Sequence, residues 1–165
     1  MNNHGAAGDL IVRINVLATV LFTVTALAAA IVFEGFVIGL AAAVALVLFF
    51  VGIFAFLWSF WNAIQRSRGE QVAVTQLYFL AGGVAPRSVR TTMLLALAVQ
   101  CVVGLGTAIA RPDSADGSPG TSLALGVLVP LFGFGMNGLW AAFHGHYADR
   151  VSNNPRPIDQ NEHHG

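Results

Sequence analysis

Four apolar runs, each long enough to cross a lipid bilayer as a helix, constrain this chain more than any other feature. They cover residues 14–33, 36–61, 92–110 and 123–143. About 20 residues, rising 1.5 Å each, span the hydrocarbon layer. The runs lack the alternation of barrel strands, and backbone groups in lipid must be satisfied internally. The sequence therefore predicts an all-α fold, a four-helix transmembrane bundle.

The composition supports this fold class and excludes several others. Hydrophobic residues make up 56% of the 165 residues, and only 10% are charged. Soluble domains carry about 25% charged residues, so this chain has too little charge to cover a globule with a polar surface. The same numbers argue against a disordered chain and against a nucleic-acid partner. The expected partner is the lipid bilayer itself.

The arginines predict the orientation of the bundle. All eight basic residues are arginine. If the N-terminus is cytoplasmic, only Arg111 lies outside, and the cytoplasmic side holds the other seven: Arg13, Arg66, Arg68, Arg87, Arg90, Arg150 and Arg156. Positively charged segments stay on the cytoplasmic side of a membrane. We therefore predict a multi-pass protein of the cell membrane with both termini in the cytoplasm.

The connections between the runs differ in kind. Glu34 and Gly35 form a tight turn, in which Gly35 is expected to take the left-handed conformation that ends a helix. Before the last run, Thr121 or Ser122 is expected to cap the helix that follows.

The second connection, residues 62–91, contains an apolar stretch that is too short to span a membrane. This stretch, residues 72–86, is too apolar for a free loop. We expect a short helix in the cytoplasmic interface, ended by Gly82 and Gly83. The alternative is a loop folded back onto the ends of the spans.

Polar side chains within the runs are candidates for an interior site. The candidates are Thr19, Thr23, Gln100 and Asn137. An amide that faces lipid loses its hydrogen bonds, so Gln100 and Asn137 should face the bundle interior. Two interpretations follow. The polar groups line a path or ligand pocket, or they form interhelical hydrogen bonds worth about 0.6 kcal/mol on average. We favour the second, because no ionisable group accompanies them.

Glycines within or next to the runs are candidates for close helix packing. Residues 133–138 match G-x-G-x-x-G, but the match lies within a span, so a nucleotide-binding loop is rejected. Glycines let a neighbouring backbone approach, which favours helix packing within the chain over a homodimer contact. The packing candidates are Gly35, Gly39, Gly104, Gly133, Gly135 and Gly138.

Charged and histidine side chains at the ends of the runs complete the candidates. Glu34 is expected to pair with Arg111 at the outer surface, in an exposed ion pair worth about 0–1 kcal/mol. We expect residues 1–143 to form one membrane domain and residues 144–165 to form a flexible cytoplasmic tail. His144 and His146 are metal-ligand candidates, but a flexible tail preorganises no site, so no metal or cofactor is expected.

Two segments carry a resemblance to a known group of proteins. LAVQCVVGLGTAIARP, residues 97–112, and LALGVLVPLFGFGMNGLWAAFHG, residues 123–145, are similar to small four-span membrane proteins of high-GC Gram-positive bacteria that have no assigned activity. The resemblance implies a bacterial inner-membrane location. It supplies no catalytic residues.

Three functions are compatible with these features. The favoured hypothesis is a non-catalytic accessory, scaffold or assembly subunit that packs against another membrane protein or a second copy of itself. The first alternative is a small oligomeric transporter or channel with a polar path near Gln100 and Asn137. The second is a membrane enzyme with a cytoplasmic-face site near His144 and His146, where loop arginines bind lipid phosphates.

Overall fold

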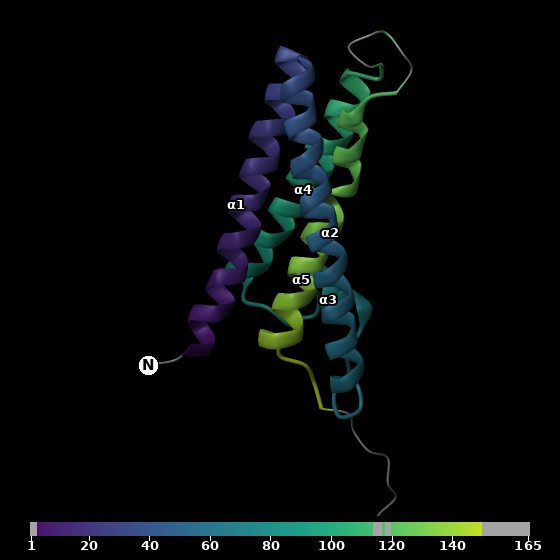
Figure 1. Ribbon diagram of the computed structural model, residues 1–165. Coiled ribbons are helices and arrows are strands. Elements are labelled where there is room, and N and C mark those ends of the chain that lie inside the picture. The colour runs from purple at the N-terminus through teal and green to yellow at the C-terminus, as the bar shows by residue number, and fades with distance from the viewer. Residues whose placement is uncertain (1–2, 114–116, 118–119, 150–165) are drawn as a thin grey trace, which may run out of the picture.

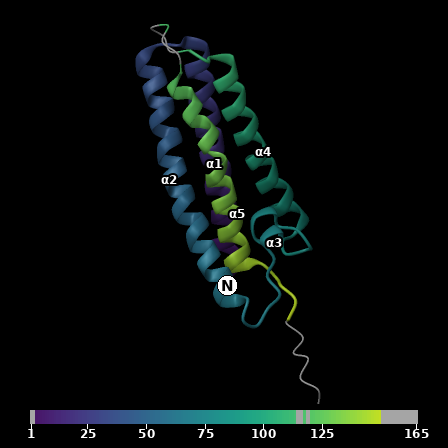
Figure 2. The same ribbon diagram turned by 90° about the vertical axis from the view of Figure 1, so that its right-hand side faces the viewer.

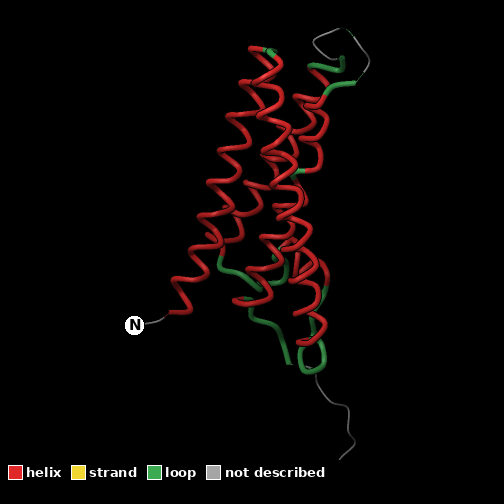
Figure 3. The backbone as a smooth tube through the Cα atoms, in the orientation of Figure 1, coloured by secondary structure: helices red, strands yellow, loops and turns green. Residues whose placement is uncertain are grey.

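The structure, a computed structural model, describes residues 3–113, 117 and 120–149, and almost all of this part is helical (Figure 3). Its elements are α1 (Asn3–Val32), α2 (Gly35–Arg66), α3 (Val74–Phe79), α4 (Arg87–Ala110), the 3₁₀ helix η1 (Ser122–Leu128) and α5 (Pro130–His144). Four stretches are long and apolar enough to cross a membrane: Ala7–Val32, Gly35–Arg66, Arg87–Ala110 and Ser122–His144. The predicted all-α bundle with four candidate spans is confirmed.

The spans pack side by side as an elongated bundle (Figures 1 and 2). At one end lie α3, the start of α1 and the end of α5, and we call this the α3 end. The opposite end holds the turn between α1 and α2, the end of α4 and the start of η1. Both described ends of the chain therefore lie at the α3 end.

Helix α5 is the central element, and it contacts α1, α2, α3 and α4. Helices α2 and α4 flank it on either side (Figure 2). Nine of its 15 residues are buried, three of them glycines. Because a glycine has no side chain, neighbouring helices approach α5 closely at these positions. The α2 backbone lies against Gly135, and side chains of other elements lie against Gly133 and Gly138.

The flanking helix α2 shows how an outer helix packs against α5. Its buried positions recur every three or four residues and are mostly small: Ala41, Ala45, Leu48, Gly52, Ala55, Ser59 and Ala63. The other face of α2 exposes large apolar side chains, among them Phe54 and Trp61. A small-residue stripe toward the protein and a bulky apolar face toward lipid are typical of a packed transmembrane helix.

The fourth span is not the single continuous α-helix that its apolar run suggested. It consists of η1 followed by α5, with Val129 between them. Pro130 has no N–H group, and its ring would clash with the carbonyl of Gly126 in a continuous α-helix. Val129 N–H donates instead to Gly126, three residues back, and Phe132 N–H donates to Val129. The tighter 3₁₀ pattern thus carries the chain past the proline.

The turn between α1 and α2 differs from the prediction in one residue. Phe33, with φ 53°, takes the left-handed conformation. Gly35 is instead the first residue of α2, so its predicted role is wrong. The reason is that α1 ends at Val32, which moves the turn one step earlier. Arg111 stacks on the Phe33 ring, with its guanidinium carbon 4.5 Å from the ring centre. The predicted cap before the last span is confirmed, because the Thr121 side chain accepts from Leu123 N–H.

The predicted short helix between the second and third spans is present as α3. It ends at Phe79, earlier than Gly82, because Leu80 takes the left-handed conformation with φ 52°. The segment is buried against the bundle on one side, since Leu77 and Val84 are 2% and 1% exposed. It therefore also folds back onto the helix ends, as the alternative interpretation held.

Three helices extend beyond the apolar runs that predicted them. Helix α1 begins at Asn3, α2 continues to Arg66, and α4 begins at Arg87. Hydropathy marks the part of a helix that suits the hydrocarbon layer, whereas the hydrogen-bonded helix continues into polar sequence. The extra turns at the α3 end carry the arginines discussed below.

Candidate functional site

Three buried polar side chains between α1 and α4 form what we call the interior polar cluster: Asn15, Thr19 and Gln100. Asn15 and Gln100 are both 0% exposed. The Gln100 amide nitrogen donates to the Thr19 hydroxyl at 2.7 Å and to Asn15 Oδ1 at 3.3 Å. The Thr19 hydroxyl donates to the Asn15 carbonyl at 2.7 Å. The cluster links α1 to α4 deep within the spans, as predicted for Thr19 and Gln100.

Two atoms of this cluster have no hydrogen-bond partner in the described part of the chain. They are Asn15 Nδ2 and Gln100 Oε1. Gly133 of α5 faces the second of them, since a Cβ atom on Gly133 would lie 2.5 Å from Gln100 Oε1. Gln100 therefore occupies space that a side chain at position 133 would need. Thr23 lies one turn beyond Thr19 and bonds to the Thr19 carbonyl at 2.8 Å.

A second polar cluster, the α3 anchor, joins α3 to α2 and α5. The Asn137 amide nitrogen donates to the Tyr78 carbonyl at 2.9 Å, and its oxygen has no partner in the described chain. The Tyr78 ring stacks on Phe56 with ring centres 4.3 Å apart. Ser59 contacts the position where Gly138 would carry its Cβ. Asn137 faces the interior as predicted, and it holds α3 in place.

The candidate packing glycines fall into two groups. Gly104, Gly133, Gly135 and Gly138 all meet a neighbouring helix where a Cβ atom would lie. At Gly104 that neighbour is the Gly126 carbonyl oxygen at 2.5 Å, and at Gly135 it is the Gly52 carbonyl oxygen at 2.7 Å. Gly35 and Gly39 have no atom within 4 Å of that position. These two positions are therefore open in the part of the chain that the structure describes.

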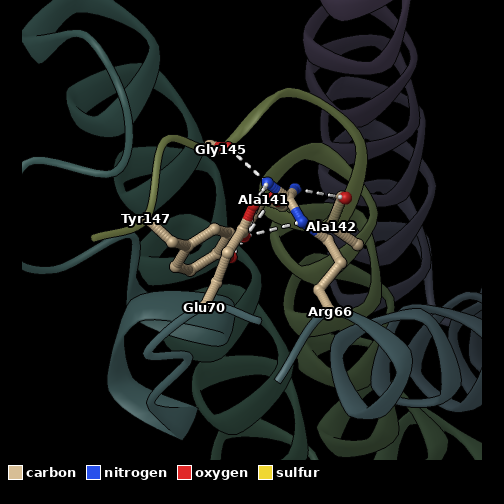
Figure 4. A network of polar contacts seen from close by, with 6 residues as sticks. All are labelled: Arg66, Glu70, Ala141, Ala142, Gly145 and Tyr147. Carbon is tan, nitrogen blue, oxygen red and sulfur yellow. Dashed lines mark hydrogen bonds and ion pairs between the residues drawn. The ribbon is translucent and has the colours of Figure 1, made fainter. Parts of the chain in front are cut away.

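Arg66 at the end of α2 organises the α3 end (Figure 4). Its guanidinium makes a bidentate ion pair with Glu70, at 2.9 Å from Nε and 3.1 Å from Nη2. It also donates to the carbonyls of Ala142 at 2.9 Å and Gly145 at 3.3 Å. The last carbonyls of a helix lack partners within the helix, and a cation there also matches the helix dipole. Arg66 therefore ties the end of α2 to the end of α5.

Tyr147 covers this network from the other side. Its ring lies under the Arg66 guanidinium, 4.9 Å from the guanidinium carbon to the ring centre. Its hydroxyl donates to the Ala141 carbonyl at 3.2 Å. Burial raises the pKa of Tyr147 to about 12, against a smaller lowering effect of the Arg66 charge. The phenol is a neutral hydrogen-bond donor at physiological pH.

The predicted ion pair between Glu34 and Arg111 is not among the ion pairs of the described residues. Arg111 Nε donates to the Ala30 carbonyl at 3.0 Å, and its guanidinium lies over Phe33. Arg111 thus closes the last turn of α1, where a carbonyl needs a donor. Glu34 is exposed in the turn.

The two histidine candidates lie in different surroundings. His144 packs beside Trp140, with ring centres 5.8 Å apart, and Gly8 of α1 lies against both. His146 is exposed, and its backbone N–H donates to the Val84 carbonyl at 3.2 Å. The described residues contain no group of three or more His, Cys, Asp or Glu side chains placed to hold a metal ion. Arg150, Arg156 and most of the predicted tail lie outside the described residues.

Buried polar side chains in the described chain are all uncharged at neutral pH. They are Asn15, Thr19, Ser59, Gln100, Thr107 and Asn137. Such groups orient helices and accept or donate hydrogen bonds, but an amide or aliphatic hydroxyl carries no proton across a membrane by titration.

Sequence reasoning missed three residues of these clusters. Asn15 and Ser59 lie within the predicted runs but were not recognised as interior residues. Asn15 precedes Thr19 by four residues, a spacing that places both on one helix face and was a usable signal. Arg66 was assigned only to orientation, and no local pattern points to its bond with Ala142 of α5, 76 residues later.

Comparison with known proteins identifies no matching family model, curated protein or solved structure. The fold and the four spans define the class: this is a multi-span membrane protein of the α-helical type. The resemblance to small four-span proteins of high-GC Gram-positive bacteria stays a prediction.

Replacing Arg66 by methionine should lower the free energy of unfolding by about 1.5–3 kcal/mol, because buried carbonyls lose a charged donor. Arg68 is the matched control: it is exposed, lies two residues away and has no recorded partner in the described chain. Arg68→Met should change stability by less than about 0.5 kcal/mol. Denaturant titration in detergent micelles measures both. Equal effects of the two substitutions would contradict the assigned role of Arg66.

Proposed function

We propose that the protein is a non-catalytic membrane subunit that packs against another membrane protein or a second copy of itself, as an accessory, scaffold or assembly factor. One observation carries the proposal. The buried polar side chains of the described spans are uncharged, and the bonds of Gln100 and Asn137 join one helix to another. This interior suits a fixed packing unit better than a proton-coupled transporter or an enzyme.

The outer faces of the bundle also support the proposal. Large apolar side chains are exposed on every outer helix: Leu17 is 68% exposed on α1, Phe54 is 73% on α2, and Val102 is 70% on α4. In a membrane such faces contact lipid or the helices of a partner. A bundle with three exposed apolar faces is suited to association within the bilayer.

The alternative function, a small transporter or channel, has one observation in its favour. The interior polar cluster contains two unpartnered polar atoms, and Thr19 also faces an open groove between α1 and α4. An unpaired amide in the spans is a place where a polar solute or ion would gain hydrogen bonds. For an enzyme, the unpartnered Nδ1 of His144 is the corresponding observation.

Photo-cross-linking in intact membranes tests the proposal against both alternatives. A photoreactive side chain is placed in turn at Leu17, Phe54 and Val102, with buried Phe132 as the matched control. We expect one exposed position to give a product of defined mass with a partner or a second copy, and position 132 to cross-link only within the chain. Proteoliposomes should show the same solute and ion flux as protein-free liposomes.

Two results would overturn the proposal. One is a chain that stays monomeric at every cross-linking position. The other is flux above the protein-free level that disappears in Gln100→Leu, since a packing amide contributes only stability. A phenotype lost in His144→Ala while expression is unchanged would favour the enzyme.

We further propose that the α3 end is cytoplasmic, in the cell membrane of a bacterium. Arg66, Arg68, Arg87 and Arg90 belong to this end, whereas Arg111 belongs to the opposite end. With Cys101 changed to serine, single cysteines at exposed Gln71 and Asp113 report the two ends. An impermeant maleimide added to intact cells should label Asp113→Cys and spare Gln71→Cys. The reverse pattern would contradict the orientation.

A further inference from the structure

An open groove of about 410 Å³ lies between α1 and α4. Its walls are mostly apolar and include Val16, Val20 and Val24 of α1 and Leu95 and Val99 of α4. Three threonines also line it: Thr19, Thr23 and Thr92. We call it the α1–α4 groove. Its volume falls in the range of about 300–1,000 Å³ that is typical of small-molecule sites. Both helices run from the α3 end (Figure 2), and the groove lies between residues 16–24 of α1 and residues 92–99 of α4.

A second hollow, of about 380 Å³, lies at the foot of this groove, at the α3 end. Arg87, Arg90 and Leu94 line it, and Leu95 lines both hollows, which makes them adjacent. Arg13 lies three residues before Val16, so helical spacing places it one turn below the groove on the side of α1 that lines it. Basic side chains from both helices therefore flank the foot of an apolar groove.

The three arginines at the groove have no hydrogen-bond or ion-pair partner in the described chain. Arg13, Arg87 and Arg90 are all exposed. Arg66 and Arg111, in contrast, use their guanidinium groups on backbone carbonyls. The exposed carboxylate of Asp9, one turn before Arg13, forms no ion pair within the described residues. The groove arginines are thus available to an anionic ligand, whereas Arg66 and Arg111 are occupied by the fold.

We propose that the α1–α4 groove binds one anionic phospholipid, with its phosphate at Arg87 and Arg90 and an acyl chain along the valines of α1. Charge complementarity selects this occupant over a partner helix, because an apolar helix gains nothing from three unpaired guanidinium groups. Guanidinium binds phosphate through paired N–H donors. Helix α4 begins at Arg87 without a side-chain cap, so its positive end adds to the attraction.

The dimensions of the groove fit a lipid. From Arg87 to Thr92, at the lower end of the groove on α4, five residues of helix rise about 8 Å. From Val16 to Val24 the groove wall rises about 12 Å. The charged foot and the apolar wall thus follow one another along the bundle axis, in the order of a headgroup and its chain. Polybasic clusters at the ends of spans bind anionic headgroups for the same reason.

Lipid retention by the detergent-purified chain tests this site. Native mass spectrometry counts bound lipid after incubation with phosphatidylglycerol or phosphatidylcholine. We expect one phosphatidylglycerol molecule to be retained in preference to phosphatidylcholine. Arg87→Gln and Arg90→Gln should each weaken its binding about fivefold. Arg68→Gln is the matched control, because it removes an exposed arginine of the same end away from the groove, and it should leave binding unchanged.

A second pair of variants tests whether the wall of the α1–α4 groove contacts the lipid. Val20→Phe fills the groove and should reduce phosphatidylglycerol retention, whereas Val47→Phe, on the exposed face of α2, should not. Thermal unfolding of each variant without lipid checks that it folds. Equal retention of the two lipids, equal effects of Arg68→Gln and Arg87→Gln, or full competition by inorganic phosphate would each overturn the proposal. A cross-linked partner helix at Val20 that survives Arg87→Gln would overturn it in favour of helix docking.

Discussion

The close approach of neighbouring helices to the glycines of α5 is the interaction on which the rest of the structure depends. Gly135 faces the Gly52 carbonyl of α2, and Gly133 faces Gln100 of α4. Without the classical hydrophobic effect between helices in lipid, association relies on such close packing and on interhelical hydrogen bonds. With α5 at the centre, α1, α2 and α4 each keep one face for the interior and one for the membrane.

The polar interior follows from this packing. Gln100 has room to reach Thr19 and Asn15 because Gly133 presents no side chain, and Asn137 holds α3 against the adjacent part of α5. Each interhelical hydrogen bond in a membrane contributes about 0.6 kcal/mol, up to about 2. These hydrogen bonds determine which helix faces contact each other, and the glycines determine how closely the helices approach. Among the described residues, the buried polar side chains of this interior carry no charge.

The sequence was sufficient to locate the four spans but not to predict which residues of distant segments contact each other. Hydropathy is a local property, so the runs located all four spans, and the interior position of Gln100 followed from its cost in lipid. The break before Pro130 was visible as a proline but was not read as a 3₁₀ segment. The left-handed Phe33 and the bonds of Arg66 depend on contacts between distant segments, which no local pattern contains. The open positions of Gly35 and Gly39 show that glycine spacing alone does not identify a packed face.

The arginines divide into those that hold the fold and those that are available to bind. Arg66 and Arg111 stabilise the ends of helices at opposite ends of the bundle. Arg87 and Arg90 line the hollow at the foot of the α1–α4 groove, and Arg13 lies one helical turn before Val16 of the groove wall. All three arginines are exposed and have no partner in the described chain. In a chain with only 10% charged residues, this division assigns a physical role to most of the basic groups. Binding of a lipid in the groove is compatible with the proposed scaffold function. The lipid site itself does not depend on that function.

A double-mutant cycle between Gly133 and Gln100 tests the central packing claim most directly. Gly133→Ala alone should lower the free energy of unfolding by about 1–3 kcal/mol, because its Cβ meets Gln100 Oε1. In a Gln100→Ala background that oxygen is absent, so the cost of the alanine should fall by about 1 kcal/mol or more. Free energies that add to within about 0.5 kcal/mol would show that α5 and α4 do not meet at these residues, and would contradict the account.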